Sequence, residues 1–219
     1  MNLTLFLVIP AGLFFISACN DGTKTSTTNS DTVVIQTLNM KDTMKVENGM
    51  MESMKKMMAT MDVMQMTGDF DTDFSSMMIQ HHQGAIDMAK IEVSKGTDEK
   101  VKRMAQNIIA KQTEEQGKLT EIVDSYKSKQ SKPDSTHAEH RLHDVMINMM
   151  DKMKGMEMAN NTDKDFLMMM IPHHESAIEM SKSELSFGKN SQLKQLAQKG
   201  ITDQTKEIYE FKNWLSLNK

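Results

Sequence analysis

Apolar residues recur every three or four positions along most of the chain beyond residue 45, a period typical of amphipathic helices. The pattern predicts two methionine-rich helices, at about 46–66 and 142–156. It also predicts four longer helices, which cover about 72–95, 98–127, 164–187 and 191–217. No stretch alternates apolar and polar residues as a strand would. The chain is therefore predicted to be all-α, with four long helices and two added Met-rich ones.

The helical pattern occurs twice. Residues 77–88, MMIQHHQGAIDM, return at 169–180 as MMIPHHESAIEM, an offset of 92 residues (77 to 169). The same offset relates Phe74 to Phe166 and Gly96 to Gly188. A repeat of this length marks a duplicated structural unit. We therefore expect one helical domain, 39–219, built from duplicated helical-hairpin units at about 46–127 and 138–217.

Two kinds of residue in the repeats carry a structural prediction of their own. Gly96 and Gly188 are expected to end the histidine-containing helices. Pro172 stands where the first copy has Gln80. Because proline lacks an N–H and clashes with the preceding turn, Pro172 predicts a kink or a helix start that frees the carbonyl of Met168.

The first residues of the chain indicate export. Residues 3–16 form an apolar run of signal-peptide length, which ends in Ile-Ser-Ala-Cys. This ending resembles a lipoprotein cleavage box, although no Lys or Arg precedes the run. We expect a signal peptide at 1–18, lipidation of Cys19 and a flexible polar tether at 19–38, so that the protein is membrane-anchored in the periplasm or at the cell surface. An ordinary secretory signal with an incidental cysteine is the alternative.

The composition limits the expected partners and the side chains that could bind a metal. The net charge is −4, so no strongly basic balance points to nucleic acid. Cys19 is the single cysteine, which leaves the folded part without a thiolate ligand. Methionine, in contrast, occurs 25 times. Any metal site must therefore use histidine, methionine and carboxylates.

A helical projection at 100° per residue places one histidine of each pair near the centre of the apolar stripe. These inward residues are His81 and His173, whereas His82 and His174 are expected at its edge or as supporting groups. On the following helices, Gln112 and Glu115, and in the second copy Gln204 and Glu207, interrupt the apolar stripe. Folding each helix pair about its glycine turn brings His81 level with Gln112 and sets Glu115 opposite Met77 and Met78.

Methionine and histidine together favour a soft metal, because thioethers and imidazoles suit Cu(I) and Ag(I). We expect the protein to bind such an ion for sequestration, transfer or tolerance. The candidate ligands and supporting residues are His81, His82, His173, His174, Met77, Met78, Met88, Met169, Met170, Met180, Met54, Met57, Met58, Met61, Glu115 and Glu207.

Two other functions remain open. A ferritin-like oxidoreductase would hold two iron or manganese ions with His81, Glu115, His173 and Glu207. Such sites use Glu-x-x-His within one helix, however, and no motif histidine stands in that spacing. A metal-free module could instead bind protein partners through its methionines, and each single methionine or histidine also fits simple core packing.

The doubled pattern Met-Ile-x-His-His-x-x-Ala-Ile-x-Met, followed by Ala-x-x-Ile/Gly-Ile-x-x-Gln-x-x-Glu, resembles the domain of unknown function 305 (DUF305) family. The resemblance covers roughly residues 69–219. It implies a ferritin-like helical fold, and a link of some members to periplasmic copper binding.

Overall fold

The computed structural model describes residues 49–127 and 138–219, which contain six helices. The helices are α1 (Gly49–Asp62), α2 (Phe70–Lys95), α3 (Glu99–Lys127), α4 (Ala138–Lys154), α5 (Thr162–Phe187) and α6 (Ser191–Leu217). The described residues contain no strand, so the all-α prediction is confirmed. The expected signal peptide, the tether and Cys19 lie outside the described residues. Among the helices that can be described, none is long and apolar enough to cross a membrane.

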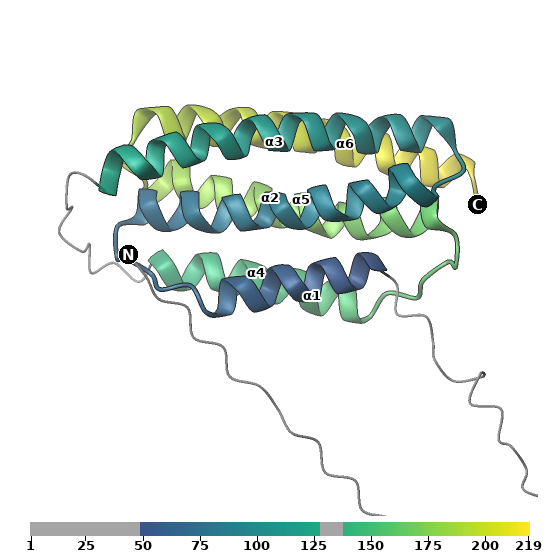
Figure 1. Cartoon of the computed structure of the whole chain (residues 1–219), viewed down its shortest axis with the longest axis horizontal. Helices are drawn as coiled ribbons and strands as arrows, with labels where there is room; N and C mark the ends of the chain where they lie inside the picture. Colours follow the sequence, from purple (N-terminus) through teal and green to yellow (C-terminus); the bar gives the residue numbers. More distant parts are fainter. Residues whose placement is uncertain (1–48, 128–137) are drawn as a thin grey trace, which may run out of the picture. The chain divides into compact units, whose positions relative to one another are not determined.

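The helices form three layers of two, and the histidine helices occupy the middle layer (Figure 1). Helix α2 packs against α1, α3 and α5, and α5 packs in the same way against α4, α6 and α2. Helices α2, α3, α5 and α6 thus make a four-helix bundle from two equivalent hairpins. The Met-rich helices α1 and α4 cover the remaining face of α2 and α5. This arrangement confirms the predicted duplicated hairpin with added Met-rich helices.

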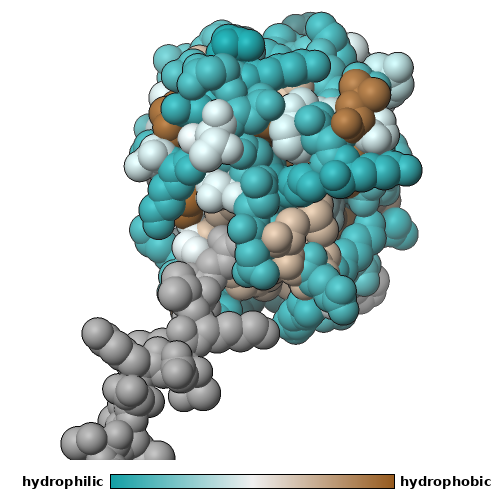
Figure 2. Space-filling model, turned by 90° about the vertical axis from the view of Figure 1, so that its right-hand side faces the viewer, coloured by the Kyte–Doolittle hydropathy of each residue, from teal (hydrophilic) through white to brown (hydrophobic). Residues whose placement is uncertain are grey.

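Methionine fills the space between the outer Met-rich layer and the histidine helices. The methionines of α1 that point inward are Met50, Met54, Met57 and Met61, and those of α4 include Met146, Met149 and Met153. All of them belong to one continuous core cluster. The bundle end seen in Figure 2 is mostly hydrophilic, with scattered apolar residues. The methionine excess is therefore mainly an interior feature of the part that the structure describes.

The ends of α2 and α5 are built alike. The side chain of Asp69 caps α2 by accepting from the backbone N–H of Thr72, and Asn161 caps α5 by accepting from Lys164 N–H. Gly96 and Gly188 end the two helices as expected, but their φ angles are both −63°, a value open to any residue. Glycine is needed for space instead. A Cβ on Gly96 would overlap the carboxyl group of Glu92, and Gly188 stands in the same relation to Glu184.

Two aspartates join the repeats to each other. Asp163, in the first turn of α5, accepts hydrogen bonds from the backbone N–H groups of Thr97 (3.0 Å) and Asp98 (2.9 Å) in the α2–α3 turn. Its counterpart Asp71 accepts from the backbone N–H groups of Lys189 (2.8 Å) and Asn190 (3.1 Å) in the α5–α6 turn. Each repeat thus supplies the carboxylate that satisfies the helix start of the other.

Pro172 lies inside α5, which runs without interruption from Thr162 to Phe187. The helix start proposed for this position is therefore wrong. Packing of α5 between α2, α4 and α6 outweighs the local penalty of the proline. The carbonyl of Met168 still lacks its helical partner, because the proline nitrogen carries no hydrogen.

Candidate functional site

Two histidines meet at the centre of the molecule. His81 of α2 and His173 of α5 stand at equivalent positions of the repeats, and their ring centroids are 3.8 Å apart. Both side chains are fully buried. Burial lowers the pKa of His81 and of His173 well below the usual value, and the neighbouring histidines lower it further. Both imidazoles are therefore neutral at neutral pH, so each ring keeps a nitrogen lone pair.

The two central histidines have different partners. His81 Nε2 is hydrogen-bonded to the hydroxyl of Ser176, at 2.8 Å. The same hydroxyl oxygen lies 3.1 Å from Met149 Sδ and 2.7 Å from the carbonyl oxygen of His173. Neither ring nitrogen of His173 has a hydrogen bond of regular geometry among the described residues, and the nearby backbone of His81 offsets only part of the fall in the pKa of His173. A buried polar atom without a partner is costly, so these nitrogens mark a place where a ligand would be favourable.

The outer histidines pair with carboxylates. His82 Nε2 lies 3.0 Å from Glu115 Oε2, and His174 Nε2 lies 2.8 Å from Glu207 Oε2. Both histidines are buried more deeply than a position at the edge of the apolar stripe suggests, since only 3% of His82 and none of His174 is exposed, while their role as supporting groups stays a prediction. A middle-layer helix is covered on two faces, so residues beside its main stripe are buried as well. Within the described residues, the Nδ1 atoms of both rings have no partner.

Lysines from the opposite repeat hold the two glutamates. Lys199 Nζ lies 3.5 Å from Glu115 Oε1, and Lys111 Nζ lies 2.8 Å from Glu207 Oε1. Burial acts to raise the pKa of each glutamate, but the hydrogen bond to its histidine and the lysine charge outweigh burial and lower the pKa. The glutamates are therefore ionised. An ionised carboxylate favours a proton on the histidine Nε2 that faces it.

The remaining predicted residues lie in the same core. Buried methionines surround the histidine layer from α1, α2 and α5, namely Met54, Met57, Met61, Met77, Met78, Met88, Met169, Met170 and Met180. Met58 is only partly buried. Gln112 and Gln204 are buried, and their side-chain oxygens have no partner among the described atoms. The structure thus gathers four histidines, two carboxylates and many thioethers around the α2–α5 contact.

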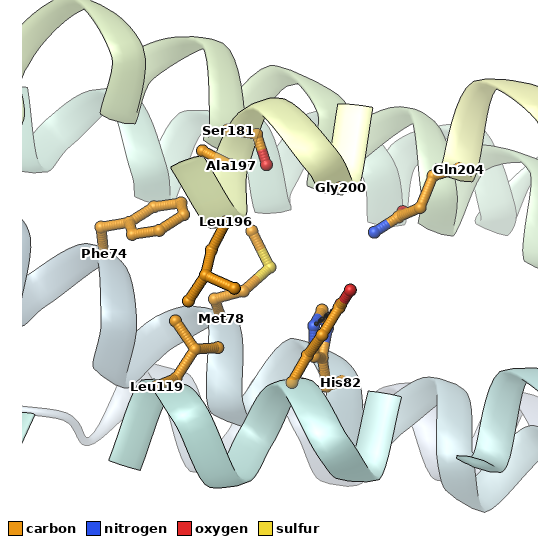
Figure 3. Close-up of a pocket in the computed structure, with 10 residues that line it drawn as sticks. Phe74, Met78, His82, Leu119, Ser181, Leu196, Ala197, Gly200 and Gln204 are labelled. Carbon is orange, nitrogen blue, oxygen red and sulfur yellow. Dashed lines mark hydrogen bonds and ion pairs between the residues drawn. The ribbon is translucent and has the colours of Figure 1, made fainter. Parts of the chain in front are cut away.

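A small cavity of about 20 Å³ opens beside His82. Its polar lining comes from His82, Glu115, Ser181 and Gln204, and Met78 contributes to its wall. Figure 3 shows His82 and Gln204 on opposite walls, with the Gln204 amide directed toward the intervening space. A space of this size holds about one water-sized group.

The structure does not favour the carboxylate-bridged alternative. Within residues 49–127 and 138–219, no group of three or more His, Asp or Glu side chains is arranged to hold a metal ion. Glu115 and Glu207 contact the outer histidines and the lysines, and not the central pair His81 and His173. A metal site in this core therefore depends on thioether sulfur as well as imidazole nitrogen.

Sequence reasoning missed Ser176 and Gly84, and it did not single out Met149 as a ligand. The offset between the repeats held the signal, since it aligns Ser176 with Gly84 and Met149 with Met57. The second histidine helix has a serine where the first has a glycine. This difference indicates that the surroundings of the two central histidines are not identical.

The structure is similar to CopM in its Cu(II)-bound form, with 28% identity and a TM-score of 0.50 over 66% of this chain and 95% of CopM. For CopM in its Cu(I)-bound form the identity is 27% and the TM-score 0.52, over 67% and 95% of the two chains. A DUF305 protein from Streptomyces coelicolor shares the fold, with 21% identity and a TM-score of 0.53 over 69% of this chain and 94% of that one.

No protein of curated function matches the sequence. The family model described as "Domain of unknown function (DUF305)" matches it twice, over residues 20–123 and 71–215. These two segments together span most of the chain and follow its internal repeat. The chain therefore belongs to the DUF305 family.

Proposed function

We propose that this protein binds soft metal ions, Cu(I) or Ag(I), through methionine and histidine. The observation that carries the proposal is the pair of neutral, buried histidines with unpartnered nitrogens in a methionine-lined core. Neutral imidazole and thioether are the donor types that suit these ions. CopM, which has a similar structure, has been observed in Cu(I)-, Cu(II)- and Ag-bound forms.

The biological role that we propose depends on the location of the protein outside the cytoplasm. The apolar run at 3–16 and the Ile-Ser-Ala-Cys ending support export and anchoring through lipidated Cys19. Outside the cytoplasm thiols are liable to oxidise, whereas a neutral thioether keeps its softness. The protein would therefore sequester, transfer or confer tolerance to a soft metal at the membrane surface. Its expected partners are the metal ion and the membrane, not nucleic acid.

The test is an anaerobic titration of the full chain with Cu(I) against a chromophoric chelator of moderate affinity. Cu(I) and Ag(I) should bind well before Zn(II) or Mg(II). His81→Ala with His173→Ala should weaken binding, whereas His143→Ala is the matched control. His143 is half-exposed and lies 3.7 Å from Asp62, on the surface.

A second variant set tests the thioethers. Leucine at Met54, Met57, Met58 and Met61 should weaken Cu(I) binding and preserve helicity, because leucine packs similarly. Met66→Leu, at an exposed position, is the control. Bound iron or manganese that survives these changes but is lost in Glu115→Ala with Glu207→Ala would support the di-metal alternative. Absence of competitive Cu(I) binding by the wild type would refute the proposal and leave a metal-free Met-packed bundle.

A further inference from the structure

Two surface clefts lead toward the histidine layer, one in each repeat. The cleft between α4 and α5 has a volume of about 760 Å³ and that between α1 and α2 about 40 Å³. Each of the eight residues that line the smaller cleft has its repeat counterpart in the larger one. The pairs that matter are Met57 with Met149 and Gly84 with Ser176. The clefts are therefore two versions of one feature, and a buried methionine beside the histidine helix forms part of the wall of each.

In the larger cleft, a continuous polar chain runs inward. Met149 and Ser176 line the cleft, and the Ser176 hydroxyl oxygen lies 3.1 Å from Met149 Sδ and 2.8 Å from His81 Nε2. A sulfur and an imidazole nitrogen thus flank a single oxygen atom. The pair is one that a soft cation would bridge, but the hydroxyl already occupies the place between them.

In the smaller cleft, Gly84 contributes no hydroxyl at the equivalent place, and methionine side chains approach its backbone instead. Gly84 is buried, and a Cβ built on it would lie 2.6 Å from Met57 Sδ and 2.9 Å from Met54 Cε. The repeat relation sets His173 against Gly84 as His81 stands against Ser176. Neither nitrogen of His173 has a hydrogen bond of regular geometry among the described residues, whereas His81 Nε2 is bonded to the Ser176 hydroxyl. The repeat relation therefore places the first-repeat thioethers beside a histidine that no hydroxyl group engages.

We infer that the two repeats bind soft metal with unequal affinity: His173 and Met57, on either side of Gly84, form the tighter site, and His81 and Met149, bridged by Ser176, form the weaker one. The inference rests on the proposed function and specifies where that function resides. The physical reason for the unequal affinity is that the metal competes with the Ser176 hydroxyl for His81 but with no side-chain hydroxyl for His173. At Ser176 the metal must displace a hydroxyl that is already bonded to the histidine, whereas at Gly84 it binds a nitrogen that no side chain of the described residues engages.

The experiment exchanges the two distinguishing residues in the full chain. Cu(I) affinity and stoichiometry are measured by anaerobic chelator competition. Gly84→Ser should weaken the first equivalent, by about tenfold or more, because altering even a group that supports a metal ligand costs about 10- to 100-fold. Ser176→Gly should leave the first equivalent unchanged and strengthen the second. Circular dichroism checks that each variant is folded.

The serine of the Gly84→Ser variant crowds Met57, so that variant could fail to fold. Matched methionine variants test the inference in that case. Met57→Leu should weaken the first equivalent, whereas Met149→Leu should affect only the second, since leucine preserves the packing. Methyl resonances of labelled methionine should report Ag(I) at Met57 before Met149. Two equal wild-type sites, or equal losses in the two leucine variants, would overturn the inequality and leave soft-metal binding in place. A wild type that binds no Cu(I) would overturn both.

Discussion

Replacing Glu92 by Gln should stabilise the protein at neutral and alkaline pH and leave its stability almost unchanged near pH 4. Glu92 is fully buried, and its pKa is raised to about 8. Burial is the largest cause, and the neighbouring Asp163 adds to it through its hydrogen bond and its charge. The two carboxyl groups approach each other without a hydrogen bond of regular geometry. Asp163 keeps the negative charge, because the Thr97 and Asp98 N–H groups bind it.

Proton linkage determines whether the free energy of unfolding rises or falls with pH. Glu92 is protonated in the folded protein at pH 7 but ionised in the unfolded chain, so folding takes up a proton. Its favourable contribution is complete below about pH 4.5 and is lost as the pH rises toward 8. The shift from 4.5 to about 8 corresponds to a loss of roughly 3 kcal/mol by pH 7. Glutamine is always neutral and can donate to Asp163, so Glu92→Gln should avoid most of this loss.

Urea unfolding followed by circular dichroism at pH 4 and at pH 8 measures the effect. The free energies of unfolding of variant and wild type should agree at pH 4 and differ by several kcal/mol at pH 8, with the variant more stable. Glu121→Gln, at an exposed position, is the matched control and should follow the wild type at both pH values. Equal stability of Glu92→Gln and wild type at pH 8 would show that Glu92 is ionised in the folded protein.

Three further predictions concern other parts of the chain. Gly96→Ala should destabilise the bundle by about 1–3 kcal/mol in urea unfolding, because the new methyl group overlaps the Glu92 carboxyl and approaches the Glu92 backbone carbonyl, and Glu92→Ala should restore only the part of the loss that the carboxyl causes. Met146→Ala should lower the free energy of unfolding by about 2–5 kcal/mol, since it opens a cavity at a fully buried site, whereas Met146→Leu should cost less than about 1.5 kcal/mol. Cys19→Ser should abolish labelling by a palmitate analogue, and labelling that persists would contradict lipidation.

The amino-acid sequence by itself determined the helices and their duplication. Apolar residues at three- and four-residue spacing specify helices locally, whatever packs on them. The offset between residues 77 and 169 showed that the two histidine pairs are equivalent in origin. The absence of cysteine beyond Cys19, with 25 methionines, limited the possible donors to histidine, thioether and carboxylate. These features depend on residue type and order, which a sequence states directly.

Only the tertiary structure decided which groups meet. A helical projection assumes one buried face, but α2 is covered by α1 on one side and by α3 on another, so His82 is buried together with His81. Folding a single hairpin also could not reveal contacts between repeats. The hydrogen bond between His81 and Ser176 spans 95 residues, and that from the Asn190 N–H to Asp71 spans 119. Such contacts depend on how the two hairpins dock, because no local periodicity records which side chains then face each other.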